Sequence, residues 1–396
     1  MCGLYSSKQR FPEPDTDAIA HSERLQSRIR HVIRQRGGWI SFHDFMELAL
    51  YEPGLGYYSG GAHKFGEAGD FITAPELSPM FSRCIARQCA AVLGEFGNGT
   101  LMELGAGSGA MAADVITELA SLNMLPDRYL ILERSADLRD RQRSLLNQRL
   151  GNLGRCVDWL DAIPKQAFSG VVLANEVVDA LPCERFRIEE DRLFAYGIGL
   201  DGDRLIQVTR PAGPKLLAAF RDLNIDSHRL PPGYESELRP GLAAWVHSII
   251  EPLDAGLALI IDYGLTRAEL YSPERSEGTL LCHYRHRAHA DPLFHVGLQD
   301  ITAWVDFTAV AETAVAAGFR IAGYTTQAHF LIGAGLHDMF TDSEAETLKE
   351  KLELARQVKL LTLPGEMGER FKVMGLSRNL AGEIDGFAYR DLGAML

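Results

Sequence analysis

The sequence has few cysteines, and none are paired at metal-binding or redox spacing. Six cysteines are scattered through 396 residues, and no two form a Cys-x-x-Cys pattern. Scattered thiols are typical of a reducing compartment, whereas small secreted proteins concentrate cysteine into disulfide frameworks. We therefore expect a cytoplasmic protein.

Long apolar runs and excess positive charge are also missing. No apolar stretch reaches the roughly 18 to 20 residues needed to span a bilayer, and prolines and acids in residues 11–15 interrupt any signal-peptide core. Lysine and arginine total 40 against 53 aspartates and glutamates, a net charge of −13. These features predict no membrane insertion and disfavour non-specific binding to nucleic acid.

From residue 101 onward, short apolar segments alternate with helical patterns. Unbroken apolar strands that alternate with helices are typical of a parallel sheet covered on both faces. The sequence thus predicts the α/β class. The expected strands are 101–104, 129–133, 156–159, 171–174, 257–264, 319–324 and 371–376, and the expected helices are 78–93, 137–150, 242–250, 307–318 and 343–361.

Other segments depart from this alternation and suggest domain boundaries. Residues 1–98 are expected to be a helical N-terminal region, disordered to about residue 20, with helices at 22–35 and 41–50 and a glycine-rich lid loop at 51–76. Period-two patterns around Asp201-Gly202 predict an antiparallel β insertion at 184–238. The core would then comprise 99–183 and 239–396, with a substrate loop at 271–306.

The strand at 101–104 runs into three alternate glycines, Gly105, Gly107 and Gly109, before a helix. Glycine permits a sharp turn and close approach of a ligand to the backbone, and the helix N-terminus favours anionic groups. Because Ala110 follows, the run also satisfies the looser dinucleotide fingerprint. Glu103, just before the glycines, favours S-adenosylmethionine (SAM), whose ammonium and sulfonium are cationic.

Acids at later strand ends extend this candidate nucleotide site. Glu133 ends the next strand and can accept both hydroxyls of a ribose, a group that SAM and NAD share. Asp158 and Trp159 follow the third strand and could hold an adenine. The alternative for this pair is a core tryptophan beside a surface acid.

The segment 175–182 follows the fourth apolar strand and carries Asn175, Glu176 and Asp179. Ligands of open parallel sheets bind outside the carboxyl ends of strands, so Asn175 is a candidate for cofactor binding. On a helical turn, Glu176 and Asp179 would face the same way and could grip a guanidinium at two points. The alternative is a plain helix N-terminus with a capping asparagine and acids in its first turn.

Histidines at 283, 286 and 289 suggest metal binding, but the intervening Arg285 and Arg287 would repel a cation. We expect no metal, and a substrate loop or surface histidines instead.

Taken together, these motifs resemble the MidA-like class I SAM-dependent methyltransferases, a group that includes a mitochondrial complex I assembly factor that methylates an arginine. The resemblance spans most of the chain from Ile40. Its most specific parts are Tyr-Glu-Pro-Gly-Leu-Gly-Tyr-Tyr (51–58), Gly-Asp-Phe-Ile-Thr-Ala-Pro-Glu (69–76), Glu-Leu-Gly-Ala-Gly-Ser-Gly (103–109), Asn-Glu-Val-Val-Asp-Ala-Leu-Pro (175–182) and Asp-Ile-Thr-Ala-Trp-Val-Asp-Phe (300–307).

The resemblance implies a Rossmann-like methyltransferase core that binds SAM at residues 103–109 and Glu133. For some members it also implies symmetric dimethylation of a protein arginine. No mitochondrial presequence is recognised, so we expect a bacterial relative, whose substrate does not follow from the resemblance.

The resulting hypothesis is a SAM-dependent methyltransferase acting on an arginine nitrogen of a protein. Glu176, Asp179 and Asp70 would be the carboxylates that localise the charge of the guanidinium and accept its proton. Three alternatives stay open: a non-catalytic SAM-binding assembly factor, a small-molecule methyltransferase, and a nicotinamide oxidoreductase.

Overall fold

The computed structural model describes residues 11–60, 72–190, 192–341 and 347–396. The chain forms two compact units. The described residues within Met1–Phe71, Asp179–Gly241 and Arg267–Trp304 belong to the first, and those within Ile72–Val178, Leu242–Thr266 and Val305–Leu396 belong to the second.

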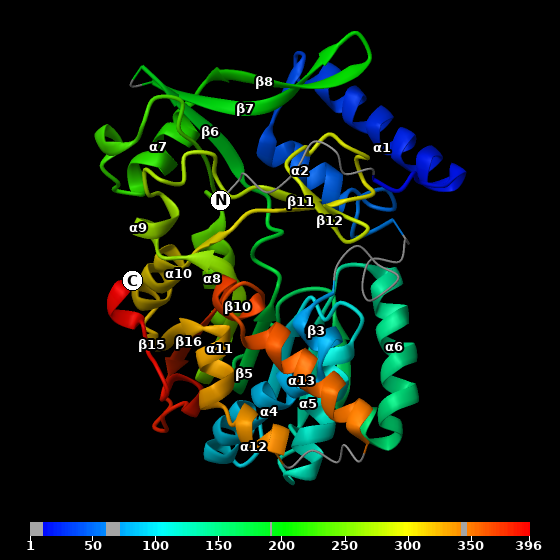
Figure 1. Cartoon of the computed structure of the whole chain (residues 1–396), viewed down its shortest axis with the longest axis vertical. Helices are drawn as coiled ribbons and strands as arrows, with labels where there is room; N and C mark the ends of the chain where they lie inside the picture. Colours follow the sequence, from blue (N-terminus) through cyan, green and yellow to red (C-terminus); the bar gives the residue numbers. More distant parts are fainter. Residues whose placement is uncertain (1–10, 61–71, 191, 342–346) are drawn as a thin grey trace. The chain divides into compact units, whose positions relative to one another are not determined.

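The second unit is built around a sheet whose strands are ordered β15-β16-β10-β5-β2-β3-β4, with a short β14 beside β10. The strands from β10 to β4 are parallel, and β16 is antiparallel to both its neighbours. The predicted α/β fold class is therefore confirmed (Figure 1). The strands are β2 (Thr100–Leu104), β3 (Arg128–Leu132), β4 (Val157–Leu160), β5 (Phe168–Asn175), β10 (Leu253–Leu265), β14 (Val305–Asp306), β15 (Arg320–Thr326) and β16 (Phe371–Arg378).

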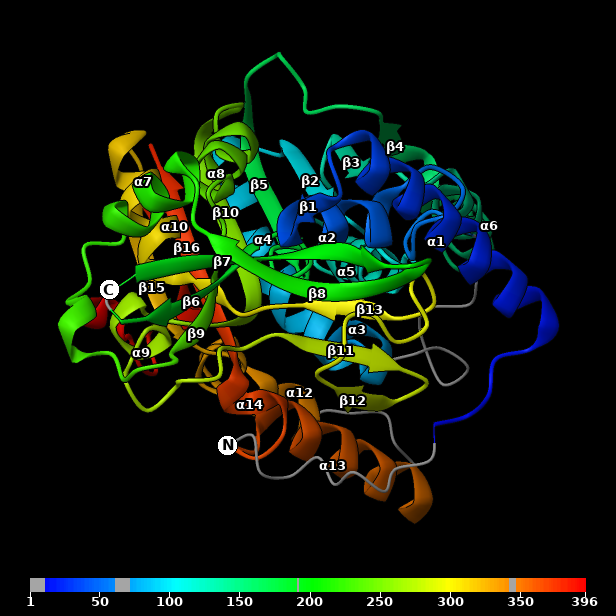
Figure 2. The same ribbon diagram turned by 90° about the horizontal axis from the view of Figure 1, so that it is seen from above.

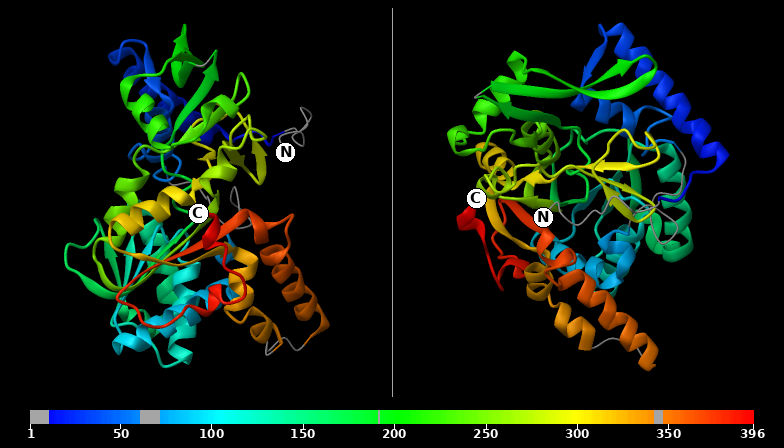
Figure 3. Two further views of the ribbon diagram at one scale, coloured as in Figure 1. Left: turned by 90° about the vertical axis from the view of Figure 1, so that its left-hand side faces the viewer. Right: turned by 45° about the horizontal axis from the view of Figure 1, so that its top comes forward.

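Helices cover both faces of this sheet (Figure 3). Leu101, Leu173 and Leu259 point to one face and share a buried core with α4 and α5, while α8 and α10 pack on each other and on β10. The helices of the unit are α3 (Ala74–Leu77), α4 (Pro79–Phe96), α5 (Ala110–Ser121), α6 (Ala136–Leu150), α8 (Leu242–Ile250), α10 (Phe307–Ala316), α11 (Gln327–Gly333), α12 (Leu336–Thr341), α13 (Leu348–Thr362) and α14 (Met367–Arg370).

The strand order reverses direction between β2 and β5. From β2 the chain proceeds to β3 and β4 on one side, then returns to β5 and β10 on the other side. In open α/β sheets, ligands bind at the carboxyl ends of the two strands that flank such a reversal. The glycine loop follows β2 and Asn175 ends β5, so two predicted site segments emerge at this point.

The first unit contains two antiparallel sheets, ordered β1-β7-β6-β9 with β8 on β7, and β12-β11-β13 (Figure 2). Apolar side chains of α1, α2 and these strands share one buried cluster. The elements are α1 (Thr16–Gln35), β1 (Trp39–Ser41), α2 (Phe42–Tyr51), β6 (Glu184–Glu189), β7 (Arg192–Asp201), β8 (Arg204–Pro211), α7 (Pro214–Asp222), β9 (Glu235–Leu238), α9 (Arg267–Leu270), β11 (Leu281–Tyr284), β12 (Arg287–His289) and β13 (Asp300–Thr302).

Local signals gave several correct boundaries. Ser78 caps α4 with Pro79 at its first position, Ser41 caps α2, and β7 and β8 pair around the turn that begins at Gly202. The helix that begins at Pro79 belongs to the second unit, although the sequence grouped it with the N-terminal region.

Three expectations were wrong. Residues 16–20 are helical, because the Asp15 side chain accepts the Ala18 N–H and starts α1 early. The segment 271–306 is more than a loop, since β11 pairs with β12 on one side and with β13 on the other. These short strands show no alternation of apolar and polar residues from which the sequence could have predicted them. Helices α11 and α12 were not expected at all. Part of the lid loop, 61–71, lies outside the described residues.

Candidate active site

The glycine loop connects β2 to α5 in a conformation that only glycine adopts freely. Gly105, Gly107 and Gly109 have φ of +62°, +54° and +88°, all in the left-handed region. Gly109 is the N-cap of α5 and supplies no side-chain hydrogen bond to the helix. The loop therefore presents bare backbone and the N-terminus of a twelve-residue helix at the reversal point of the sheet.

Glu103 lies on the same face of β2 as Leu101 and is 1% exposed. Its Oε2 accepts a hydrogen bond from the Tyr129 hydroxyl at 2.5 Å. Burial raises the pKa of Glu103 to about 7, against the opposing effect of the Tyr129 hydrogen bond. Burial thus opposes the negative charge on which the interpretation of Glu103 as a partner for cationic groups depends.

Glu133 follows β3 and is held by two donors. Its Oε1 accepts the backbone N–H of Ser135 at 2.9 Å, and its Oε2 accepts Nε2 of Gln142 at 3.2 Å. Burial raises its pKa, and these hydrogen bonds oppose the rise. The carboxylate is thereby fixed in orientation beside the glycine loop.

Gln142 is a residue that sequence reasoning missed. It occupies a position in α6 that is spaced four residues from the buried Leu138 and Leu146. A polar side chain within an apolar helical stripe was the available signal, because buried amides need hydrogen-bond partners. Gln142 also receives the Trp159 Nε1–H at 2.9 Å.

Asp158 and Trp159, the pair proposed to hold an adenine, have different surroundings in the structure. Trp159 is partly buried, with the Arg143 guanidinium 5.0 Å from its ring centre. The side chain of Asp158 is 60% exposed and its carboxylate lies 3.3 Å from Arg128. The two side chains lie on opposite faces of the sheet, because successive residues of a strand such as β4 point to opposite faces.

The end of β5 carries an uncommon backbone conformation. Glu176 has φ of +54°, which is uncommon outside glycine and costly unless the surroundings enforce it. Its Oε1 accepts Nδ2 of Asn175 at 3.2 Å and the backbone N–H of Ala74 at 3.4 Å. The prediction of a helical turn at 176–179 is wrong, since these residues form bends and a turn.

Asp262, near the carboxyl end of β10, anchors this segment, and it too was missed. It is fully buried, and its Oδ2 accepts the N–H groups of Val177 at 3.2 Å and Val178 at 2.8 Å. A buried carboxylate that accepts two consecutive N–H groups satisfies them in the way a capping side chain does. It therefore ties the segment after Glu176 to β10.

Asn175 tests whether a cationic ligand fits here. Its Oδ1 is buried and has no hydrogen-bond partner among residues 11–60, 72–190, 192–341 and 347–396. Buried acceptors left unsatisfied are costly, and they mark places where a donor is expected. An ammonium such as that of SAM would supply the donor, so the residues at this strand end fit the cofactor.

Asp179 belongs to the first unit and is 5% exposed. Burial raises its pKa to about 6, while the nearby Arg239 guanidinium lowers it. The guanidinium of Arg239 donates to the carbonyl oxygens of Asp179 at 2.6 Å, Leu181 at 3.0 Å and Trp304 at 2.8 Å. A single arginine thus joins the segments 179–181 and 303–304.

A pair of stacked tyrosines completes this region of the first unit. The rings of Tyr51 and Tyr58 lie 5.5 Å apart, and the Tyr58 hydroxyl donates to Oδ1 of Asp300 at 3.0 Å. The Tyr51 hydroxyl donates to the carbonyl of Ala180. Parts of three motifs, 51–58, 175–182 and 300–307, therefore meet within one unit.

One proposed catalytic acid, Asp70, is not among the described residues. Burial lowers the pKa of His283 to about 4, which keeps the imidazole neutral, and no group of three His, Cys, Asp or Glu residues in the described part of the chain could hold a metal ion.

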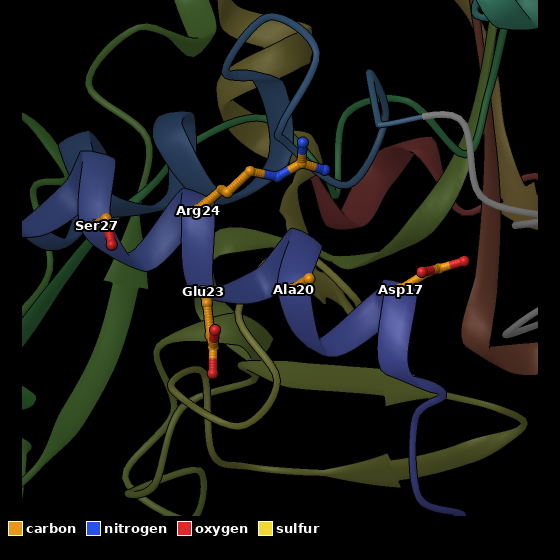
Figure 4. Close-up of a pocket in the computed structure, with 5 residues that line it drawn as sticks. All are labelled: Asp17, Ala20, Glu23, Arg24 and Ser27. Atoms are coloured by element: carbon orange, nitrogen blue, oxygen red, sulfur yellow. The ribbon is translucent and has the colours of Figure 1, made fainter.

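Among the described residues, five from α1 line a surface hollow in the first unit: Asp17, Ala20, Glu23, Arg24 and Ser27 (Figure 4). None of these five is a predicted site residue.

Within the described ranges, no helix is both long enough and apolar enough to cross a membrane.

Comparison with known proteins identifies the family. A family model described as "Putative S-adenosyl-L-methionine-dependent methyltransferase" matches residues 84–325. A crystal structure from Burkholderia thailandensis, bound to S-adenosyl-homocysteine, is 42% identical with a TM-score of 0.93, covering 98% of this chain and 100% of that one. A second structure from that organism is 41% identical with a TM-score of 0.90, at the same coverage.

Curated relatives extend the comparison along nearly the whole chain. The mitochondrial protein arginine methyltransferase NDUFAF7 homologue of Drosophila melanogaster is 28% identical over 95% of this chain and 90% of its own length. The corresponding protein of Caenorhabditis elegans is 27% identical over 93% and 90%. With its parallel sheet, left-handed glycine loop and matched family model, the chain belongs to the S-adenosyl-L-methionine-dependent methyltransferases and uses SAM as its methyl donor.

Proposed function

We propose that this methyltransferase transfers a methyl group to a guanidino nitrogen of an arginine in a protein substrate. Relatives named as protein arginine methyltransferases align with more than nine-tenths of the chain. The observation that carries the proposal is the end of β5. There Glu176 has a left-handed backbone, and no donor in the described part of the chain satisfies the Oδ1 of the neighbouring Asn175. Strained backbone of this kind is concentrated at functional sites.

The cofactor site that we propose consists of the glycine loop and the neighbouring strand ends. Gly105, Gly107 and Gly109 would admit SAM against the backbone, Glu133 would accept the ribose hydroxyls, and Asn175 Oδ1 would accept the ammonium. When bound, SAM supplies a methyl carbon made electrophilic by its cationic sulfur. Glu103, Asp158 and Trp159 stay proposed members of this site.

The proposed catalytic groups are carboxylates, because a guanidinium with a pKa above about 12 is a poor nucleophile. Glu176 would localise the positive charge on one side of the guanidinium and raise the electron density of the attacking nitrogen. As the new N–C bond forms and the S–C bond breaks, that nitrogen releases a proton to a carboxylate. Asp179, whose pKa of about 6 leaves it mostly ionised at pH 7 to 8, is suited to accept the proton. Asp70 is proposed as a third acid.

The test is methyl transfer from isotope-labelled SAM into proteins of a cell lysate, followed by mass spectrometry of the labelled residues. We expect label on arginine, and a loss of about 10²-fold or more in rate for Glu176→Gln, the usual range for a lost acid or base. Glu190→Gln is the matched control, because Glu190 is an exposed glutamate that also has positive φ, at +46°.

Three other outcomes would contradict parts of this proposal. Label confined to small molecules would contradict the protein substrate, and binding of S-adenosylhomocysteine without any labelled product would favour a non-catalytic assembly factor. Full activity of Glu176→Gln would remove that residue from the mechanism.

We also propose that the protein works in a reducing compartment such as the cytoplasm. Five cysteines in the described ranges are free thiols: Cys84, Cys89, Cys156, Cys183 and Cys282. Thiol titration of protein isolated under alkylating conditions would count them, and disulfides among them would contradict the proposal.

A further inference from the structure

One buried amide links three parts of the proposed cofactor site. Gln142 lies in the middle of α6 and is fully buried. Its Nε2 donates to the carbonyl of Gly107 at 3.0 Å and to Oε2 of Glu133 at 3.2 Å, and its Oε1 accepts Nε1–H of Trp159 at 2.9 Å. The glycine loop, the acid after β3 and the tryptophan of β4 therefore share a single side chain.

The chemistry of the partners sets the orientation of this amide. An indole nitrogen only donates, so the amide oxygen of Gln142 must face Trp159. Its NH₂ group then faces two acceptors, the Gly107 carbonyl and the Glu133 carboxylate. Both N–H donors and the oxygen are satisfied, and a fully satisfied buried network holds its members in one arrangement.

The backbone of α6 lies directly against the glycine loop. A Cβ at Gly109 would lie 3.4 Å from the Cα of Gln142, which is ordinary van der Waals contact. This proximity lets the short Gln142 side chain reach the loop, while the φ of +88° at Gly109 is what favours glycine there.

These contacts fix the orientation of the Glu133 carboxylate. Ser135 N–H holds Oε1 and Gln142 holds Oε2, which leaves the remaining lone pairs of both oxygens in defined directions for two hydroxyl groups. Without Gln142, the carboxylate could rotate, and the Gly107 carbonyl and the indole N–H would each lose a partner.

We propose that Gln142 is a positioning residue for SAM, acting through Glu133 and Gly107 to hold the ribose acceptor and the glycine loop in their binding geometry. This inference rests on the proposed cofactor site. It predicts that the effect of Gln142 on cofactor affinity depends on the presence of Glu133.

The experiment is a double-mutant cycle on the whole chain, with the dissociation constant of S-adenosylhomocysteine measured by calorimetry. Gln142→Met keeps the length of the side chain and removes its polar atoms. We expect affinity to fall about tenfold to a hundredfold, the equivalent of a lost hydrogen bond to a charged group. In a Glu133→Ala background, the same substitution should weaken binding by a clearly smaller factor, because only the contact of Gln142 with the Gly107 carbonyl is then lost.

Gln88→Met is the matched control, because Gln88 is also a buried helical glutamine in the second unit and accepts the N–H of Gly386 at 3.0 Å. Its affinity for S-adenosylhomocysteine should be unchanged. Should Gln142→Met fail to fold, the isosteric Gln142→Glu serves. Its carboxylate would repel Glu133, so binding should be weak at pH 8 and recover toward pH 5, where a protonated carboxyl can donate.

Wild-type affinity in Glu133→Ala would overturn the proposed cofactor site. Weak binding by Glu133→Ala together with wild-type affinity in Gln142→Met would overturn only the role of Gln142. Equal losses from Gln142→Met in both backgrounds, or no pH recovery in Gln142→Glu, would likewise show that Gln142 does not act through Glu133.

Discussion

Replacing Glu103 by glutamine should change how the stability of the protein depends on pH. The Glu103 side chain on β2 is buried against the Tyr129 hydroxyl. Its pKa is about 7 in the folded chain, compared with 4.5 for a glutamate in an unfolded chain. Between these values the folded state binds more protons than the unfolded state. The contribution of Glu103 to the free energy of unfolding is therefore fully present below pH 4.5 and is lost as pH rises through 7.

The pKa difference sets the magnitude. A shift from 4.5 to about 7 corresponds to about 3 kcal/mol, since each unit is worth about 1.4 kcal/mol. Most of this loss, about 2–3 kcal/mol, should fall between pH 5 and pH 8. Glutamine has no proton to lose, and its amide oxygen can still accept the Tyr129 hydrogen bond.

The assay is urea unfolding of the wild type and Glu103→Gln between pH 5 and pH 8, with the difference in unfolding free energy taken at each pH. Other acids with raised pKa, such as Glu184 at about 7 and Asp179 at about 6, cancel in that difference. We expect the wild type to lose about 2–3 kcal/mol relative to the variant as pH rises. A difference that stays constant would refute the reasoning, because it would mean that the buried carboxyl is ionised throughout.

Three further substitutions test the scaffold of the site. Gly107→Ala places a Cβ at φ of +54°, so we expect about 1–2 kcal/mol of destabilisation and weaker S-adenosylhomocysteine binding, both visible in thermal shift with and without ligand. Asp262 accepts the N–H groups of Val177 and Val178 on one oxygen and the N–H of Tyr263 on the other. In Asp262→Asn one of these sides faces an NH₂ donor in place of an acceptor, so a loss of about 2–3 kcal/mol is expected, and an unchanged melting temperature would contradict this role. Arg239→Lys keeps the charge but loses the planar guanidinium that donates to several carbonyls. We expect the free energy of unfolding to fall by about 2–4 kcal/mol in a denaturant titration. Arg210→Lys is the control, because Arg210 is an exposed arginine of the same unit.

Much of the fold followed from local patterns in the sequence. The run Leu101–Leu104 before Gly105 predicted a strand and a loop, and the glycines do adopt left-handed angles. Ser78-Pro79 predicted the start of α4, and Asp201-Gly202 predicted the turn between β7 and β8. Each depends on residues a few positions apart, so the sequence displays it directly.

The segment 175–182 shows where local reasoning failed. Asparagine followed by acids is typical of a helix N-terminus, yet Glu176 is left-handed and no helix forms. The segment is instead anchored by Asp262, about 85 residues further along the chain, which accepts the N–H groups of Val177 and Val178. Only adjacency of β5 and β10 in the sheet brings that carboxylate to this backbone.

The sequence by itself therefore determined the class of fold, the glycine loop and the family of SAM-dependent methyltransferases, because periodicity, turn chemistry and motif spacing are properties of contiguous residues. Tertiary structure alone decided which distant side chains support the site. Gln142 reaches Gly107 across 35 residues, and Arg239 reaches Asp179 across 60. Such contacts depend on strand order and helix packing, which burial of apolar surface fixes only when the whole chain is folded.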